Sequence, residues 1–169
     1  MDKANQTVIE KNITEEIIRE IMATESGVFH DSLAWEEDEL RRSLFEPSAV
    51  TVIAYDEDGR IAGYLMAMDF SQEIDELRAD ADPEIEDISD ALYINNIVIR
   101  PDAQGKGYFG KLVKKILETF PERAISLHAS TANNCSAGMQ KYGARFIRRV
   151  EDWYGSGEPF DYLIFEPKK

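Results

Sequence analysis

The sequence lacks the features that mark disulfide-stabilised, membrane-spanning, secreted and metal-binding proteins. Only one of its 169 residues, Cys135, is a cysteine, so no disulfide can form within the chain, and we expect a reducing, cytoplasmic setting. No apolar run approaches the length that crosses a bilayer. Residues 1–12 are mixed and polar, so we expect neither a membrane segment nor a signal peptide. No spacing of Cys, His, Asp and Glu is typical of a metal site.

Basic residues are also scarce. The chain has 19 Lys and Arg against 33 Asp and Glu, a net charge of −14. Because nucleic-acid binding needs clustered Lys and Arg to contact phosphates, we expect no nucleic-acid partner. The charge permits a cationic substrate, but it also serves solubility, which is the more ordinary reason for it. The length suits one domain with one core, which we place over residues 1–169.

The hydrophobic periodicity predicts an alternation of helices and strands. We expect an amphipathic helix over 12–22, capped by Asn12, and a second over 32–45 that Pro47 ends. The further expected elements are strands over 49–55, 61–68 and 91–99, a helix over 109–120, a strand over 124–129, a helix over 133–142 with Gly143 as its C-cap, and strands over 145–151 and 160–166. This order predicts a mixed α/β domain with one strand–helix–strand crossover and antiparallel flanks.

The segment 71–90 differs from the rest of the chain. It holds nine carboxylates and a single basic residue, Arg78. We interpret it as a long loop. Long loops in compact domains are often functional, but a solvated surface segment would have the same composition, and both interpretations stay open.

The stretch QGKGYFGKLV, residues 104–113, matches three phosphate-binding patterns at once. A dinucleotide-binding fold needs an acidic residue after the next strand, and that strand instead ends in His128-Ala-Ser130. A nucleotide-triphosphate loop needs Ser or Thr after its lysine, where this chain has Leu112. The third pattern is a diphosphate cradle: a strand ending Ile97-Val-Ile-Arg-Pro101, then Gln104-Gly-Lys-Gly, then a helix whose unpaired amides face an anion.

In these residues, and in its order of elements, the sequence resembles the GNAT N-acetyltransferase superfamily over nearly the whole chain. The loop of that family reads Gln/Arg-x-x-Gly-x-Gly/Ala. Gln104 and Gly107 match it, whereas Phe109 takes the last position and Gly110 follows one residue later. The resemblance implies the GNAT fold, a mixed and mostly antiparallel sheet of six to seven strands with flanking helices. It also implies acetyl-CoA as the cofactor.

The resemblance further implies which residues hold the cofactor. The pantetheine arm would pair with the backbone of Ile97, Val98 and Ile99 as an added strand does. Asn133 or Asn134 would lie beside it. The diphosphate would be surrounded by Gln104, Gly105, Lys106, Gly107, Tyr108, Phe109 and Gly110, with a charge contact from Lys111 unless that side chain is only solvated.

The catalytic positions of the family are altered in this sequence. The usual acidic residue on the strand would fall at Asn95 or Asn96, and an amide is no base. The usual tyrosine on the last helix falls at Met139. Tyr142 is nearby but faces another direction on an ideal helix. Asn95 and Tyr142 are therefore the candidates at these positions, and Asp69 or an acid of segment 71–90 acting through water is the alternative base. We interpret His128 as structural. His30 lies between the first two helices, a region that lines the acceptor pocket in the family, and we favour no substrate role for it over a substrate contact.

The function that the resemblance implies is transfer of acetyl from acetyl-CoA to a primary amine by direct attack in a ternary complex. The acceptor is a small cationic amine or a peptide or protein amine. The alternative is a CoA-binding sensor or scaffold with little catalysis. In the family the C-terminal hairpin often pairs between subunits, which favours a homodimer.

Overall fold

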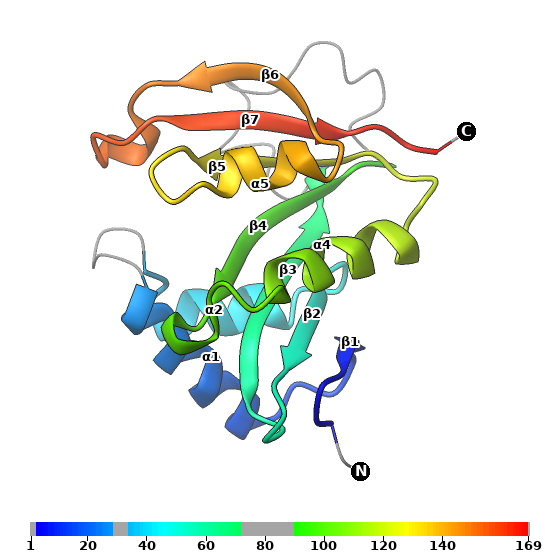
Figure 1. The fold of residues 1–169 in the computed structure, drawn as a ribbon, viewed down its shortest axis with the longest axis vertical. Coiled ribbons are helices and arrows are strands. Elements are labelled where there is room, and N and C mark those ends of the chain that lie inside the picture. The colour runs from blue at the N-terminus through cyan, green and yellow to red at the C-terminus, as the bar shows by residue number, and fades with distance from the viewer. Residues whose placement is uncertain (1–2, 29–33, 72–89, 169) are drawn as a thin grey trace. The chain divides into compact units, whose positions relative to one another are not determined.

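The computed structural model describes residues 3–28, 34–71 and 90–168. Seven strands form one sheet in the order β1-β2-β3-β4-β5-β7-β6 (Figure 1). The chain divides into two compact units, residues 1–66 with 96–119 and residues 67–95 with 120–169. The mixed α/β class and the number of strands are confirmed. His30 and residues 72–89 of the acidic segment lie outside the described residues. No described helix is long and apolar enough to cross a membrane.

The first unit contains the N-terminal strands. β2 (Val50–Tyr55) and β3 (Ile61–Asp69) are joined by a turn in which the Asp56 carboxylate accepts hydrogen bonds from two backbone amides of the turn. β1 (Thr7–Glu10) pairs antiparallel with β2, with Thr7 opposite Ala54. β1 was not predicted, because it has only four residues, all half-buried, and no alternation of apolar and polar side chains.

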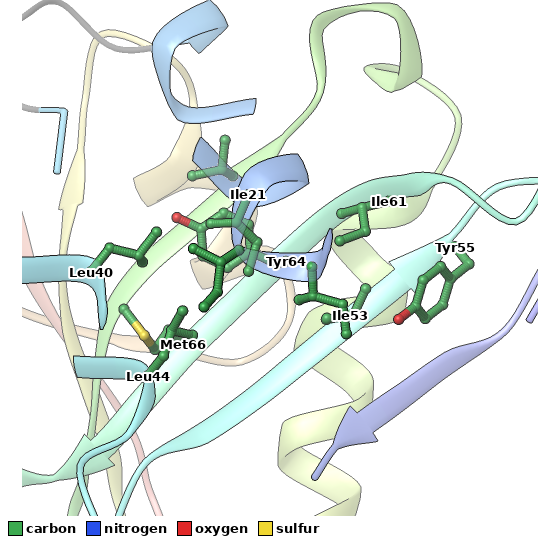
Figure 2. Packing of buried hydrophobic residues seen from close by; sticks show 11 residues of the cluster. Ile21, Leu40, Leu44, Ile53, Tyr55, Ile61, Tyr64 and Met66 are labelled. Carbon is green, nitrogen blue, oxygen red and sulfur yellow. The ribbon is translucent and has the colours of Figure 1, made fainter. Parts of the chain in front are cut away.

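Two helices complete the core of the first unit. α1 (Glu15–Val28) begins after Thr14, whose hydroxyl accepts a hydrogen bond from the Ile17 amide at 3.3 Å. The prediction of Asn12 as the cap was therefore wrong, and the helix runs six residues beyond the predicted end at residue 22. α2 (Glu37–Leu44) is shorter than predicted. Figure 2 shows how side chains of α1, α2, β2 and β3 pack together; those labelled are Ile21, Leu40, Leu44, Ile53, Tyr55, Ile61, Tyr64 and Met66.

Strand β4 (Leu92–Ile99) carries an extra residue relative to β3. The Phe70 amide donates to the Ala91 carbonyl at 2.9 Å, and the Arg100 amide donates to the Ala62 carbonyl at 2.8 Å. From Ala62 to Phe70, on the β3 side, the two bonds are eight residues apart, whereas from Ala91 to Arg100, on the β4 side, they are nine residues apart. A strand with one unmatched residue bulges and twists away from regular pairing. The bulge lies in the strand that the sequence assigned to the cofactor.

The second unit contains the first residues of β4 together with strands β5, β6 and β7. Residues Leu92–Ile94 pair in parallel with Ile125–Leu127 of β5 (Ile125–Ser130). β5 pairs antiparallel with β7 (Phe160–Phe165), which forms a hairpin with β6 (Arg145–Val150) (Figure 1). Helix α5 (Cys135–Lys141) has Tyr142 as its C-cap, so the prediction of Gly143 as the cap was off by one residue. Gly143 is the next residue, and its φ of 104° is the left-handed conformation that commonly follows a helix end.

Candidate functional site

A loop with two left-handed glycines joins β4 to α4 (Tyr108–Thr119). Gly105 and Gly107 have φ of 75° and 86°, and a Cβ added at either would meet no atom within 4 Å. These positions therefore need glycine for its conformation and not for lack of space. The Lys111 amide donates to the Gly107 carbonyl at 3.2 Å, so the helix begins directly after Gly107.

The start of α4 is suited to an anion. The first N–H groups of a helix have no partner inside it, and they lie at the positive end of the helix dipole. The first turn of α4 contains no Asp or Glu that would neutralise this end. Lys111 lies close by, with its Nζ 4.9 Å from the centre of the Tyr108 ring. Tyr108 is buried and Phe109 only half-buried, so it is Tyr108, with Gly110, that turns inward here.

Arg100 fixes the loop to the strand that precedes it. Its guanidinium donates to the Ile61 carbonyl at 2.8 Å, to Asp56 at 2.8 Å and to Asp102 at 2.5 Å. Burial works against ionisation of Asp56, but hydrogen bonds, chiefly from Arg100, outweigh it and lower the pKa of Asp56. Gln104 donates to the Ile99 carbonyl at 3.3 Å. The loop is thus tied to the end of β4, and residues 97–99 and 104–111 are held together in the first unit.

The second half of β4 lies beyond its ladder with β5. The parallel pairs stop at Ile94, and residues Ile97 and Ile99 are half-buried while Val98 is buried in the apolar core of the first unit. A strand whose pairing ends partway has N–H and C=O groups available to an extended ligand. This is the arrangement expected of a pantetheine-binding strand.

A buried polar cluster lies in the same unit, where the sequence indicated none. The Glu25 carboxylate of α1 accepts hydrogen bonds, through Oε1, from the Tyr64 hydroxyl of β3 and from Asn96 Nδ2 of β4, the latter at 2.5 Å. Asn96 Nδ2 is also 2.8 Å from the Tyr64 hydroxyl oxygen. Burial is the main cause that raises the pKa of Glu25, against opposing hydrogen bonds from Tyr64 and Asn96. Asn96 occupies a position at which the family usually has an acidic residue. Here its side chain instead holds the carboxylate of Glu25, which comes from α1.

The remaining predicted residues lie in the second unit. The Asn133 side chain accepts a hydrogen bond from the Cys135 amide at 3.1 Å and so shapes the start of α5. Tyr142 is half-buried at the C-terminal end of α5, and Met139 is fully buried. Asn95 is half-buried in β4. Their roles toward cofactor or substrate stay predictions.

His128 of β5 is enclosed by aromatic rings. Its Nδ1 is 2.9 Å from the Tyr93 hydroxyl, its ring stacks on Trp153 with centroids 4.1 Å apart, and Tyr162 packs on it at 4.7 Å. Burial lowers the pKa of His128 to about 3, so the imidazole is neutral. Its Nε2 is buried without a partner among the described residues. The packing fits the structural role predicted for this histidine.

The sheet, the bulged strand and the loop of left-handed glycines before α4 together define a mixed α/β domain. The model of the Acetyltransferase (GNAT) family matches residues 14–144, and the chain belongs to this family. No curated protein matches the sequence. Within the described residues, no group of three or more His, Cys, Asp or Glu is arranged to hold a metal ion.

Solved structures share the fold at low sequence identity. Arabidopsis thaliana NAA60 in complex with acetyl-CoA is 13% identical, with a TM-score of 0.72 over 95% of this chain and 98% of that one. The spermidine/spermine N-acetyltransferase SpeG from Vibrio cholerae is 15% identical, with a TM-score of 0.65 over 95% and 94%. GphF, a GNAT-like decarboxylase in complex with isobutyryl-CoA, is 14% identical, with a TM-score of 0.70 over 95% and 98%. The GNAT fold predicted from the sequence is confirmed.

Proposed function

We propose that this protein transfers the acetyl group of acetyl-CoA to a primary amine, which is either a small cationic amine or an amine of a peptide or protein. The observation that carries the proposal is the loop of left-handed glycines that runs from the bulged strand into α4, in a chain of the GNAT family. One similar structure was solved with acetyl-CoA, and another belongs to a polyamine acetyltransferase.

The cofactor is held mainly by backbone groups. The pantetheine arm pairs with Ile97, Val98 and Ile99, and the diphosphate accepts hydrogen bonds from the amides between Gly105 and Gly110. Gln104 holds the loop to the strand, and Lys106 and Lys111 add positive charge beside the phosphates. The resemblance to the family supports Asn133, at the start of α5, as a further residue that binds the pantetheine.

The amine attacks the thioester directly in the ternary complex. An alkylammonium with a pKa of about 10.4 must first lose a proton, which costs roughly 4–5 kcal/mol at neutral pH. A covalent acetyl-cysteine route has no support, because desolvation raises the pKa of the Cys135 thiol to about 12 although the residue as a whole is only half-buried. Asn95 and Tyr142 are the proposed polar groups near the reacting carbonyl and the leaving thiolate.

A second function has one observation in its favour. The position at which the family usually has a tyrosine is Met139, which is fully buried and cannot donate a proton. A CoA-binding sensor or scaffold would tolerate this loss, whereas an enzyme must protonate the thiolate by another route. The decarboxylase with the same fold also shows that the fold alone does not fix the reaction.

Two measurements test the proposal. Thermal denaturation with CoA, ATP or NAD compares the three phosphate ligands, and only CoA is expected to raise the melting temperature. Release of the CoA thiol from acetyl-CoA is then followed with polyamines, aminoglycosides, amino acids and peptides. Acetylation of an amine supports the enzyme; binding of CoA without turnover across the panel supports the sensor; and stabilisation by ATP or NAD instead of CoA contradicts both.

A further inference from the structure

The polar cluster of Glu25, Tyr64 and Asn96 lies in an otherwise apolar part of the first unit. Glu25 is 1% exposed, Tyr64 0% and Asn96 9%. The Tyr64 side chain packs in the apolar cluster shown in Figure 2, where its hydroxyl points toward α1. A carboxylate transferred from water to such a site loses its hydration, and the protein must replace it with hydrogen bonds.

The hydrogen bonds of Glu25 are distributed unequally between its two oxygens. Oε1 accepts from both Tyr64 and Asn96, whereas Oε2 is buried without a hydrogen-bond partner among the described residues. The backbone amide of Trp35 also favours the charged form of the carboxylate, as the last of the causes that act on the pKa of Glu25, but it is not a hydrogen-bond partner of Oε2. A buried acceptor with no partner calls for a physical reason, and a bound group that completes it is one such reason.

The place of the cluster in the unit indicates which group that is. Asn96 directly precedes Ile97, the first residue of the proposed pantetheine-binding segment. Tyr64 follows Gly63, and a Cβ on Gly63 would lie 2.7 Å from the Val98 carbonyl oxygen. One hydrogen bond, from Asn96, thus links the carboxylate directly to β4, next to the proposed pantetheine-binding segment, and the other, from Tyr64, links it to β3 beside that segment.

We propose that Oε2 of Glu25 receives the primary ammonium of the acceptor and takes a proton from it. This inference rests on the proposed acetyl transfer and names its proton acceptor. Asn96 and Tyr64 are positioning residues: they occupy Oε1 and so leave Oε2 to the amine. The amide of Asn96 on β4 then has a clear role, because it holds the Glu25 carboxylate that α1 supplies.

The proton and electron balance of the step is simple. The Glu25 carboxylate takes one proton from the ammonium, and the freed nitrogen lone pair forms the N–C bond to the acetyl carbonyl. The C–S bond breaks, the CoA sulfur leaves with its electron pair, and the second amine proton goes to that sulfur. Glu25 later releases its proton to solvent. A carboxyl whose pKa is raised toward the working pH performs such a transfer better than an ordinary carboxylate, and burial raises the pKa of Glu25 in this direction.

The test compares two small amines that differ in charge. Ethylamine is protonated at neutral pH and needs a proton acceptor, whereas methoxyamine is already neutral. The Glu25→Gln variant is expected to lower thiol release from acetyl-CoA with ethylamine by about 100-fold or more and to change the rate with methoxyamine only a few-fold. Glu16→Gln, the same substitution at an exposed position of α1, is the matched control and is expected to leave both rates unchanged.

The outcomes separate the inference from the proposed function. Equal losses with both amines, or no loss with either, overturn the role of Glu25 while acetyl transfer stands; a structural carboxylate, or one completed by water alone, gives these results. A wild-type protein that binds CoA and acetylates neither of these two amines nor any amine of the panel above overturns the proposed function and this inference with it. If Glu25→Gln does not fold, Glu25→Asp takes its place in the same comparison: a loss of about 10-fold or more confined to ethylamine supports the role, and equal losses contradict it.

Discussion

A Gly107→Ala substitution, which adds one methyl group, tests whether the loop of residues 104–110 binds the diphosphate of CoA. A residue with a Cβ pays about 1–2 kcal/mol in the left-handed region, and Gly107 has φ of 86° with open space around it. Because the loop is exposed at this residue, a Gly107→Ala variant is free to relax to negative φ before ligand binds. Binding must then restore the left-handed conformation, so we expect the Kd of CoA to rise about 5–30-fold.

Gly59 supplies the matched control for this variant. It has φ of 74°, also with no atom within 4 Å of an added Cβ, but its amide donates at 3.1 Å to the Asp56 carbonyl within the β2–β3 turn. The turn is fixed by folding, so Gly59→Ala is expected to lower stability by about 1–2 kcal/mol and to leave CoA binding unchanged. Calorimetric titration with CoA, together with thermal denaturation, measures both effects. Equal CoA affinity of Gly107→Ala and wild type refutes the reasoning, as does equal weakening by the two variants.

Two further predictions concern stability. In Gly63→Ala the new Cβ would lie 2.6 Å from Ile99 Cδ1 and 2.7 Å from the Val98 carbonyl, so we expect a loss of about 1–3 kcal/mol in urea denaturation, and an unchanged midpoint would contradict the close approach. Because the pKa of His128 falls from 6.5 to about 3 in the folded protein, the unfolded state alone binds this proton as the pH falls between those values, and stability decreases. His128→Gln removes this effect, so the difference in unfolding free energy between wild type and variant should shift by about 2 kcal/mol between about pH 7 and pH 5; a constant difference would contradict it.

Most of the fold could be predicted from the sequence because its signals are local. The apolar spacing of the α4 helix, the Ile, Val and Tyr residues of β4 and the glycine after α5 each predicted an element close to its observed bounds. β1 escaped because it is held by pairing with β2, a contact that no short window of sequence contains. The bulge in β4 escaped for the same reason, since it is defined by hydrogen bonds to β3 at its two ends.

The candidate site was only half visible in the sequence. The loop of residues 104–110 was found because glycines and a helix start must be adjacent in the chain to bind an anion. Glu25 was missed because the predicted helix ended at residue 22. One signal was present: Glu25 follows Ile18 and Ile21 at helical spacing, so a longer helix would have placed an acid on its apolar face. Its partners in β3 and β4 lie 39 and 71 residues further along the chain. Such contacts form only in the folded protein and leave no local pattern in the sequence.

The most direct test of the account is hydrogen exchange of the backbone amides between Gln104 and Lys111 with and without acetyl-CoA. If these amides bind the diphosphate, acetyl-CoA slows their exchange, together with that of Ile97–Ile99, and neither ATP nor NAD does so to the same extent. If acetyl-CoA binds and leaves these amides unprotected, the loop is not the cofactor site and the central claim is wrong.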